Sequence, residues 1–407
     1  DEAAPEPEAA EVPEAADVEE AAEPPAAPQP PPDPEPVEPA EATEPPAAGE
    51  LASEEGAGAE PPAGPPAEAA AAEEGTDVAA LVTTYLEAPS GEREGAADRI
   101  RARAEALRQD GAFGEVAAGV LELARAGIDD AGDGEALELA REILVPGVGT
   151  RIALDLGEVR EEGERDRMIE IVARLGDAMA APISEALADA SDRAARRAYI
   201  EAMVALGSSV EEQVLGMIED SRWFVVRNGV AVLGRIGDDR AIEHLTSTLA
   251  HEDLRVRRET VLALAKLGGE NAGALALGMI DDPEAEVRAA TAMALGELEM
   301  EKAVRPLRKR LEEEDDEDVQ VQILRALGQL GDPGAVPEIE KHAVASFFSR
   351  PPRPVRIAAY KALSEIGTPH AVKLLEKALD DKDSEIRVAV RGMLKSLEAE
   401  KEAEATG

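Results

Sequence analysis

The residue types that could act in catalysis or metal binding are few in this sequence and lie far apart. There are four histidines, His244, His251, His342 and His370, and there is no cysteine. The histidines lack the short mutual spacing of a metal-ligand set, and no Ser/His/Asp arrangement is recognisable. Without cysteine, the chain has no disulfide, no thiolate metal site and no cysteine nucleophile. We therefore expect no enzyme, no cofactor and no metal site.

Two acidic segments are candidates for cation binding, but their spacing argues against it. Residues 128–134 contain three aspartates without the alternating carboxylates of an EF-hand calcium loop, so we expect a solvated loop. Residues 312–318 are also acidic, and we expect a solvated turn between helices there. The sequence has neither a P-loop nor a GxGxxG motif after a strand, so no nucleotide site is indicated.

Arginines gather in the middle of the chain, although its net charge is −45. Arg197, Arg227 and Arg258 recur at intervals of 30 and 31 residues, and Trp223 lies beside them. Arginine binds carboxylates bidentately, and arginine and tryptophan are favoured at protein interfaces. We therefore expect these four residues to bind an acidic protein or peptide partner. The alternatives are that the arginines pair with neighbouring acidic residues, or that the acidic N-terminal segment of the chain covers them.

A second candidate binding region is an insertion at residues 345–354. It contains Phe347 and Phe348, which are two of the four phenylalanines of the chain. Insertions within repeat proteins map to loops on one face, which is often the binding face. We expect these rings to contact a partner, and the alternative is that they pack back onto the neighbouring helices.

The elements that must position these residues are helices that recur with a regular period. Similar helix starts fall at residues 164, 195, 225, 256, 287, 319, 355 and 386, at intervals of 30 to 36 residues. From Val287 to Leu298, apolar residues recur every three or four positions and form one stripe, as in a helix with one buried face. A fixed period of this length is typical of a solenoid. We therefore predict an all-α fold, a right-handed α-solenoid of about eight helix pairs over residues 147–397.

The motif of these helix pairs resembles that of HEAT repeats, in the short HEAT-like class of the phycobilisome lyases. The match is carried by Asp282 with the Val-Arg pair at 287–288 and by Asp381 with the Ile-Arg pair at 386–387. The resemblance implies a helical solenoid used mainly for protein–protein contact, and hence a noncatalytic scaffold. Because bilin lyases share this repeat class, an enzyme or enzyme accessory of that kind is the alternative.

The resemblance further implies a ladder of ion pairs, in which the acid and the arginine of adjacent repeats bind each other. The positions that match the motif are Asp220, Asp282 and Asp381, together with Arg165, Arg196, Arg257, Arg288, Arg356 and Arg387. Val226 and Gln320 replace the arginine in two repeats, so we expect the ladder to be interrupted there.

The two ends of the chain differ in composition from the repeats. Residues 1–75 hold 22 acidic residues and 18 prolines but no lysine or arginine, and we predict an acidic disordered tail because such a segment buries too little apolar surface. Residues 76–146 are predicted to be a divergent helical N-terminal cap. Its later helices are expected at residues 93–109, 115–126 and 135–145. Residues 398–407 are predicted to be a charged C-terminal tail.

The charge of the chain excludes two classes of partner. Sequence-independent nucleic-acid binding needs clustered lysine and arginine, and an anionic membrane surface repels an acidic chain. We therefore expect no nucleic acid partner. The sequence also lacks a run of 18 apolar residues, so we expect no membrane insertion. We expect a monomer that binds protein. The chain begins at Asp1 and not at methionine, from which we expect an exported, periplasmic protein, with a cytoplasmic one as the alternative.

Deletion of residues 1–75 is expected to leave the melting temperature and the helical circular dichroism signal unchanged. The segment has only four apolar residues larger than alanine, Val12, Val18, Val37 and Leu51, so it has little to pack against the repeats. Thermal melts of the full and shortened chains test this. A fall of more than a few degrees would show that the segment stabilises the fold.

Overall fold

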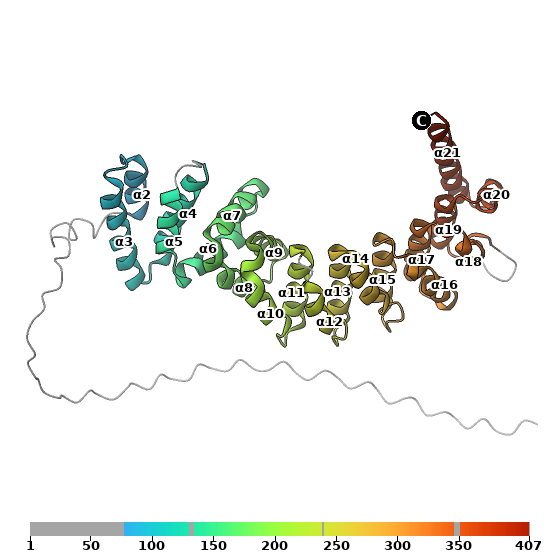
Figure 1. Ribbon diagram of the computed structural model, residues 1–407, viewed down its shortest axis with the longest axis horizontal. Helices are drawn as coiled ribbons and strands as arrows, with labels where there is room; N and C mark the ends of the chain where they lie inside the picture. The colour runs from blue at the N-terminus through green and yellow to red at the C-terminus, as the bar shows by residue number, and fades with distance from the viewer. Residues whose placement is uncertain (1–76, 130–133, 238–239, 346–350, 407) are drawn as a thin grey trace, which may run out of the picture. The chain divides into compact units, whose positions relative to one another are not determined.

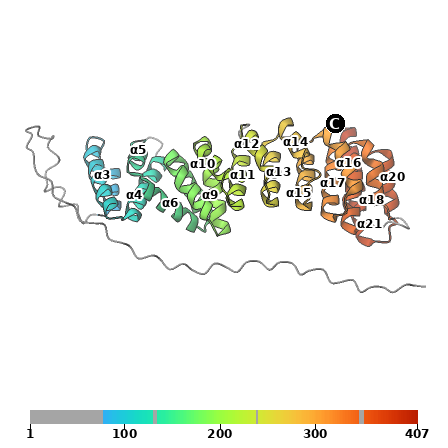
Figure 2. The same cartoon turned by 90° about the horizontal axis from the view of Figure 1, so that it is seen from below.

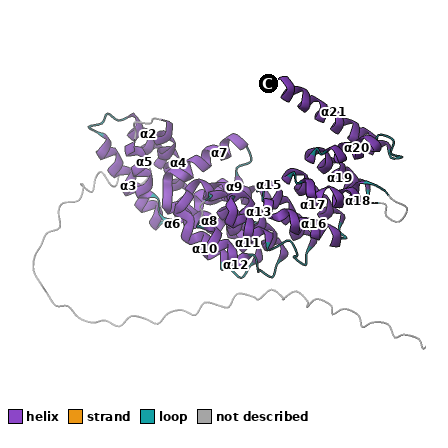
Figure 3. Ribbon diagram, turned by 45° about the vertical axis from the view of Figure 1, so that its right-hand side comes forward, coloured by secondary structure: helices purple, strands orange, loops and turns teal. Residues whose placement is uncertain are grey.

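The computed structural model describes residues 77–129, 134–237, 240–345 and 351–406, and these residues form helices without any β-strand. Residues 1–75, predicted to be a disordered tail, lie outside the described residues, as do Phe347 and Phe348. Figure 3 shows the helices and the turns that join them. Over its described length the protein is therefore all-α, as the sequence predicts.

Four helices precede the repeats. They are α2 (Val78–Glu87), α3 (Arg93–Gln109), α4 (Phe113–Asp129) and α5 (Gly134–Ile143). Helix α2 begins after Asp77, whose carboxylate accepts a hydrogen bond from the backbone N–H of Ala79. Its buried residues Val78, Val82 and Tyr85 recur every three or four positions, so one face of the helix packs against α3 and α4.

Eight helix pairs follow, counted over the described residues, and each consists of a first and a second helix. The first helices are α6 (Pro146–Glu158), α8 (Ala180–Asp189), α10 (Glu211–Ile218), α12 (Ala241–Thr248), α14 (Gly269–Leu277), α16 (Val304–Glu313), α18 (Val336–Ala343) and α20 (Pro369–Ala378). The second helices are α7 (Glu162–Leu175), α9 (Arg193–Leu206), α11 (Trp223–Ile236), α13 (Leu254–Leu267), α15 (Ala285–Glu297), α17 (Glu317–Leu330), α19 (Arg353–Ile366) and α21 (Ser384–Thr406). Every predicted helix start lies inside a second helix, so the period read from the sequence is confirmed.

The helix pairs stack in chain order. Helix α11 packs on α13, α13 on α15, α15 on α17 and α17 on α19, and each first helix packs on its own second helix. In Figures 1 and 2 the described helices follow one another from α2 to α21, so each pair meets its neighbours in the sequence. This arrangement is the α-solenoid that the sequence predicts.

Apolar residues on one side of each second helix form the core. On α15, the predicted stripe is buried, and Val287, Thr291 and Leu295 have no exposed surface. Burying a large aliphatic side chain stabilises a fold by about 1.5–3 kcal/mol. The repeated stripe therefore supplies a continuous core along the stacked pairs.

Glycines let consecutive second helices approach closely. A β-carbon built on Gly296 of α15 would lie 3.0 Å from the Cα of Ala326 on α17. One built on Gly328 of α17 would lie 2.8 Å from the Cα of Ala362 on α19. A backbone atom at that distance leaves no room for a methyl group. Both glycines are the twelfth residue of their helices, so the close approach belongs to the repeat.

Arginines on the second helices connect one helix pair to the next. Arg257 donates hydrogen bonds from Nε and Nη2 to the carboxylate of Asp282, at 2.8 and 3.0 Å. Its Nη1 donates to the backbone carbonyls of His251 and Glu252, in the turn before its own helix. The Asp282 side chain is only 3% exposed. One guanidinium group thus satisfies acceptors in two successive turns.

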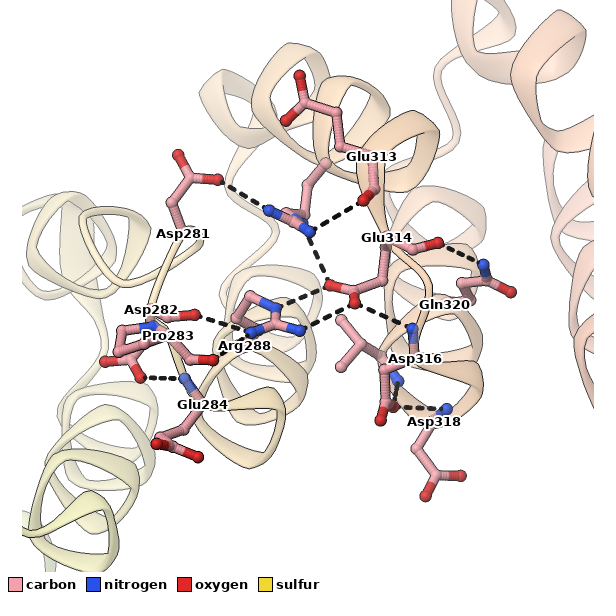
Figure 4. A network of polar contacts seen from close by, with 12 residues as sticks. Asp281, Asp282, Pro283, Glu284, Arg288, Glu313, Glu314, Asp316, Asp318 and Gln320 are labelled. Carbon is pink, nitrogen blue, oxygen red and sulfur yellow. Dashed lines mark hydrogen bonds and ion pairs between the residues drawn. The ribbon is translucent and has the colours of Figure 1, made fainter. Parts of the chain in front are cut away.

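The following pair uses a glutamate, which the sequence motif does not identify. Arg288 donates to the carboxylate of Glu314 at 2.8 and 2.9 Å and to the carbonyls of Asp282 and Pro283 (Figure 4). The Glu314 carboxylate also accepts from the backbone N–H of Asp316. Burial acts to raise the pKa of Glu314, but the hydrogen bonds from Arg288 and Asp316 outweigh it, so this pKa lies below its usual value.

Near the end of the solenoid the same contact forms with an aspartate. Arg356 is 5% exposed, binds the carboxylate of Asp381 and donates to the carbonyl of Ala343. Arg387 donates to the carbonyls of Asp381 and Lys382, and it has no carboxylate partner among the described residues. The arginine therefore keeps its backbone contacts where its acidic partner is missing.

The structure also shows what replaces the arginine at the two predicted interruptions. The side-chain amide of Gln320 donates to the carbonyl of Glu314 at 2.6 Å, which retains a backbone contact without an ion pair (Figure 4). Val226 is buried and apolar. Twenty-five residues after it stands His251, at the spacing that separates the arginine from its aspartate in the formed pairs. Both charged partners are thus absent at this position.

The predicted pair of Arg196 and Asp220 does not form. Both carboxylate oxygens of Asp220 accept hydrogen bonds from Arg222, at 3.0 and 2.9 Å. Arg222 is only two residues from Asp220, and it binds this carboxylate in place of an arginine of the neighbouring helix pair. Arg196 donates instead to the carbonyls of Ala190 and Ser191.

Arg165 also departs from the predicted ladder. It lies 3.7 Å from Glu162 on its own helix and 3.8 Å from Glu201 on α9. The residue 25 positions further on is Ala190, which has no carboxylate to offer. The ladder is therefore formed in the later helix pairs and incomplete in the earlier ones.

The C-terminal residues continue the last helix instead of forming a separate tail. Helix α21 extends to Thr406, beyond residue 397, where the solenoid was predicted to end. Residues 398–406 consist mainly of glutamate, alanine and lysine, which are strong helix formers.

The ladder predicts a loss of stability for Arg288→Ala. The Glu314 side chain is 2% exposed; without Arg288 it keeps the hydrogen bonds from Arg310, at 3.1 Å, and from the backbone of Asp316, so we expect the loss of its bidentate partner to cost about 1–3 kcal/mol. The control is Lys266→Ala at an exposed position of α13, because surface substitutions change stability by about 0.5 kcal/mol or less. Urea unfolding measures both variants, and equal midpoints would contradict the role assigned to the ladder.

Candidate protein-binding surface

Arg197, Arg227 and Arg258 lie on three consecutive second helices, α9, α11 and α13. Each is the fifth residue of its helix. Because α11 packs on both α9 and α13, the three positions follow one another across the stack. The three side chains nevertheless have different surroundings.

The two outer arginines are exposed. Arg197 has a side chain that is 64% exposed, and its Nε donates to Glu201 one turn later on α9, at 2.8 Å. The hydrogen bond and the charge of Glu201 raise the pKa of Arg197. Arg258 is exposed and forms no ion pair with any described residue. Arg197 is thus held by Glu201, whereas Arg258 is not held by an ion pair within the described residues.

Arg227 is partly buried, and no carboxylate lies within ion-pair distance of it among the described residues. Its Nη2 donates to the side-chain oxygen of Asn228 at 2.7 Å. Burial lowers the pKa of Arg227, and the positive charges of Arg196 and Arg255 lower it further, while Glu259 acts in the opposite direction. A guanidinium group in this setting is stabilised by any anion that approaches it.

Trp223 forms the aromatic part of this surface, and it is the only tryptophan of the chain. The Cζ atom of Arg255 lies 3.4 Å from the centroid of its ring, and that of Arg227 lies 5.8 Å away. Phe224 packs edge-on against Trp223, with 5.9 Å between ring centroids, and is 38% exposed. Cation–π contacts of this kind orient both guanidinium groups about one ring. We call Trp223, Arg227 and Arg255 the tryptophan–arginine cluster.

Arg255 belongs to this cluster although the repeat position alone does not identify it. Its Nε and Nη2 donate to the carboxylate of Asp253, at 3.0 and 2.7 Å. The same carboxylate caps α13 by accepting from the backbone N–H of Arg255 at 2.9 Å. The spacing Asp-x-Arg is the signal that could have identified the residue, since Asp220 and Arg222 show the same geometry.

The start of α11 explains why positive charge accumulates here. Helices α9 and α13 begin after Asp192 and Asp253, whose carboxylates accept hydrogen bonds from the first turn. Helix α11 begins after Arg222, whose side chain makes no such bond. A cation at the start of a helix is unfavourable because of the helix dipole. At the position before α11, an arginine thus replaces the capping aspartate of the neighbouring helices. This removes a negative charge and adds a positive one next to Trp223.

Two of the four central site residues predicted from sequence are thus in contact, namely Trp223 and Arg227. Arg197 and Arg258 lie on the flanking helices, and the other two predicted residues, Phe347 and Phe348, fall outside the described residues. Within the described ranges, no group of three or more His, Cys, Asp or Glu side chains is arranged to hold a metal ion. No helix in the same ranges is long and apolar enough to cross a membrane.

Comparison with known families finds two matches along the repeats. The family of HEAT repeats matches residues 180–265, 213–281 and 274–349, and the PBS lyase HEAT-like repeat matches residues 355–381. No curated protein matches the sequence.

Several solved structures match this chain at low sequence identity and low TM-score. An engineered protein is 16% identical, with a TM-score of 0.35, over 79% of this chain and 99% of its own. Human deoxyhypusine hydroxylase in complex with glycerol is 20% identical, with a TM-score of 0.28, over 62% and 98%. The CpcE–CpcF complex of phycocyanin lyase from Nostoc is 21% identical, with a TM-score of 0.32, over 54% and 94%. At these values none of the three bears on activity.

Arg227→Met is expected to raise the unfolding free energy slightly. A partly buried guanidinium group without a carboxylate destabilises the fold, and methionine still packs against Trp223. We expect a gain of about 0.5–1 kcal/mol. Arg257→Met breaks a formed ladder pair and should instead cost about 3–5 kcal/mol. Urea unfolding followed by circular dichroism compares the two, and a similar loss in both would make Arg227 a structural residue.

Proposed function

Since this chain belongs to the HEAT-repeat family, we propose that it is a noncatalytic scaffold whose second helices bind an acidic segment of a partner protein. The observation that carries the proposal is Arg227, a partly buried cation whose only polar side-chain partner among the described residues is Asn228. In a chain with a net charge of −45, an arginine has many acidic residues available to it. Among the described residues, Arg227 remains without one.

The chemistry of the cluster favours a carboxylate. Arg227 uses Nη2 for Asn228, which leaves Nε and Nη1 for an incoming acceptor. Arg255 uses Nε and Nη2 for Asp253, which leaves its Nη1. Arginine donates to carboxylates in a planar fork, and such charge-assisted bonds are stronger than neutral ones. A glutamate or aspartate of the partner would thus meet two guanidinium groups at once.

The electrostatics of the free protein support the same ligand. The pKa of Arg227 is lowered by burial and by the charge of Arg196, so the cationic side chain is destabilised before any partner binds. A carboxylate that approaches offsets this repulsion and loses less hydration than it would in a dry interior, because the site is only partly buried. Trp223 adds a broad apolar surface of the kind enriched at binding hot spots.

The proposal predicts that reversing the charge of Arg197, Arg227 and Arg258, which we call the arginine row, abolishes partner binding. The test variant carries Arg197→Glu, Arg227→Glu and Arg258→Glu, and circular dichroism first establishes that it is folded. The control carries Lys302→Glu, Lys309→Glu and Lys341→Glu, which change the charge equally at side chains that are 62–71% exposed and lie away from the second helices. Proteins captured by each chain at low ionic strength are identified by mass spectrometry.

We expect proteins with acidic segments to be captured by the wild type and the control but lost from the test variant. Exposed charge pairs are screened by salt, so the same set should also decline as ionic strength rises. Retention of an unchanged set by the folded test variant would place the binding surface elsewhere on the protein.

A further inference from the structure

A hollow opens on the second helices next to the arginine row, between α13, α15 and α17. Its volume is about 320 Å³. It exists because the repeat position of Arg227 and Arg258 is occupied in α15 by Ala289, the fifth residue of that helix. Ala285 and Ala290 are equally short, so this part of α15 forms a low floor between its neighbours.

The hollow combines an apolar floor with an acidic rim. Leu262 of α13 and Met293 of α15 line it together with Ala289. On the rim, the carboxylates of Glu286 and Asp318 are exposed, and neither forms an ion pair with a described residue. The third acid of the rim is Asp316, whose carboxylate caps α17 by accepting hydrogen bonds from its first turn. Arg258 also lines the hollow, so its rim carries three carboxylates and one guanidinium group, a net negative charge, above a floor of aliphatic groups.

We infer that this hollow binds a lysine or arginine side chain of the same partner segment that binds the tryptophan–arginine cluster. The inference rests on the proposed function, because it uses the same surface and the same partner. A long basic side chain buries its aliphatic stem along apolar surface and keeps its charge at the rim. The stem would cover Leu262 and Met293, and the cation would lie between Glu286 and Asp318.

The two positions fix a spacing in the partner. A carboxylate bound by Arg227 of α11 and Arg255 of α13 lies between one and two layers from α15, on which the hollow is centred, with each helix packed on the next. Packed helices are about 8–10 Å apart, so the separation is about 8–20 Å. An extended peptide advances about 3.3 Å per residue, so about three to six residues connect the two positions. The partner segment therefore carries an acidic residue and a basic residue about three to six positions apart.

Two labelled peptides of identical composition test this spacing on the full chain. Each contains two adjacent glutamates and one lysine among glycine and serine residues. In the spaced peptide the lysine follows six positions after the glutamates, and in the adjacent peptide it follows directly. A third peptide replaces the lysine of the spaced peptide by leucine. Fluorescence anisotropy of the label gives the three dissociation constants, and the emission of Trp223 reports binding at the cluster.

We expect the spaced peptide to bind about three- to fivefold more tightly than the adjacent peptide, as for a partly exposed ion pair. The double variant Glu286→Gln, Asp318→Asn should abolish this difference, because it neutralises the two exposed carboxylates of the rim at nearly constant shape. Arg227→Gln should weaken all three peptides, since each needs the cluster. The leucine peptide should bind as weakly as the adjacent peptide.

Other outcomes separate this inference from the proposed function. Equal binding of the spaced and adjacent peptides, with both weakened by Arg227→Gln, would overturn the hollow as a basic-residue site and leave the acidic partner in place. Tight binding of the leucine peptide would also overturn it, because the hollow would then take an uncharged group. If Arg227→Gln changes no dissociation constant, the proposed acidic contact is wrong, whatever the hollow binds.

Discussion

The stacking of the later helix pairs depends on guanidinium groups that each bind two successive turns. In the formed contacts, Arg257, Arg288 and Arg356 hold backbone carbonyls next to their own helix and a carboxylate in the following helix pair. The fork of an arginine is planar and rigid, so its donors meet both sets of acceptors in only one arrangement. These contacts are buried, and water does not replace them. Apolar packing supplies the stability of the stack, while the ladder fixes how one helix pair is placed against the next.

The proposed binding surface lies where this structural use of charge stops. On α11, Val226 stands where the formed ladder pairs have their arginine. His251 stands where they have its acidic partner. One pair earlier, Asp220 is bound by Arg222, so among the described residues Arg196 has only backbone carbonyls as partners, and its charge acts on Arg227. Charges that neutralise each other elsewhere in the solenoid are unbalanced here. The stacking of helix pairs and the proposed binding of an acidic partner thus both use arginine, at adjacent positions of the repeat.

Much of this organisation is readable from the sequence, and the exceptions have identifiable physical causes. The period predicted every second helix, because an apolar stripe and a glycine break are local features that tertiary packing reinforces. Glu314 was missed since its longer side chain reaches the same guanidinium group as an aspartate. The pair of Arg196 with Asp220 was wrong because a nearer arginine competes for the acid. Arg255 was missed since repeat alignment compares positions, whereas its side chain extends to a ring on the neighbouring helix. Whether the cluster binds an acidic partner is a property of a second molecule, which one sequence does not contain.

The glycines at the contact between second helices affect the distance between contact points on neighbouring helices of the proposed binding surface. Gly296 and Gly328 set the separation of consecutive helices by the absence of a side chain, at a place remote from the arginine row. A single methyl group at either position would act as a wedge and tilt one helix pair against the next. The tilt would alter the distance between contact points on neighbouring layers, and it would do so without changing any residue that touches the ligand. At Gly296, such a tilt would change the distance between Glu286 on α15 and Asp318 on α17, the two exposed carboxylates of the proposed site, while both side chains stayed the same.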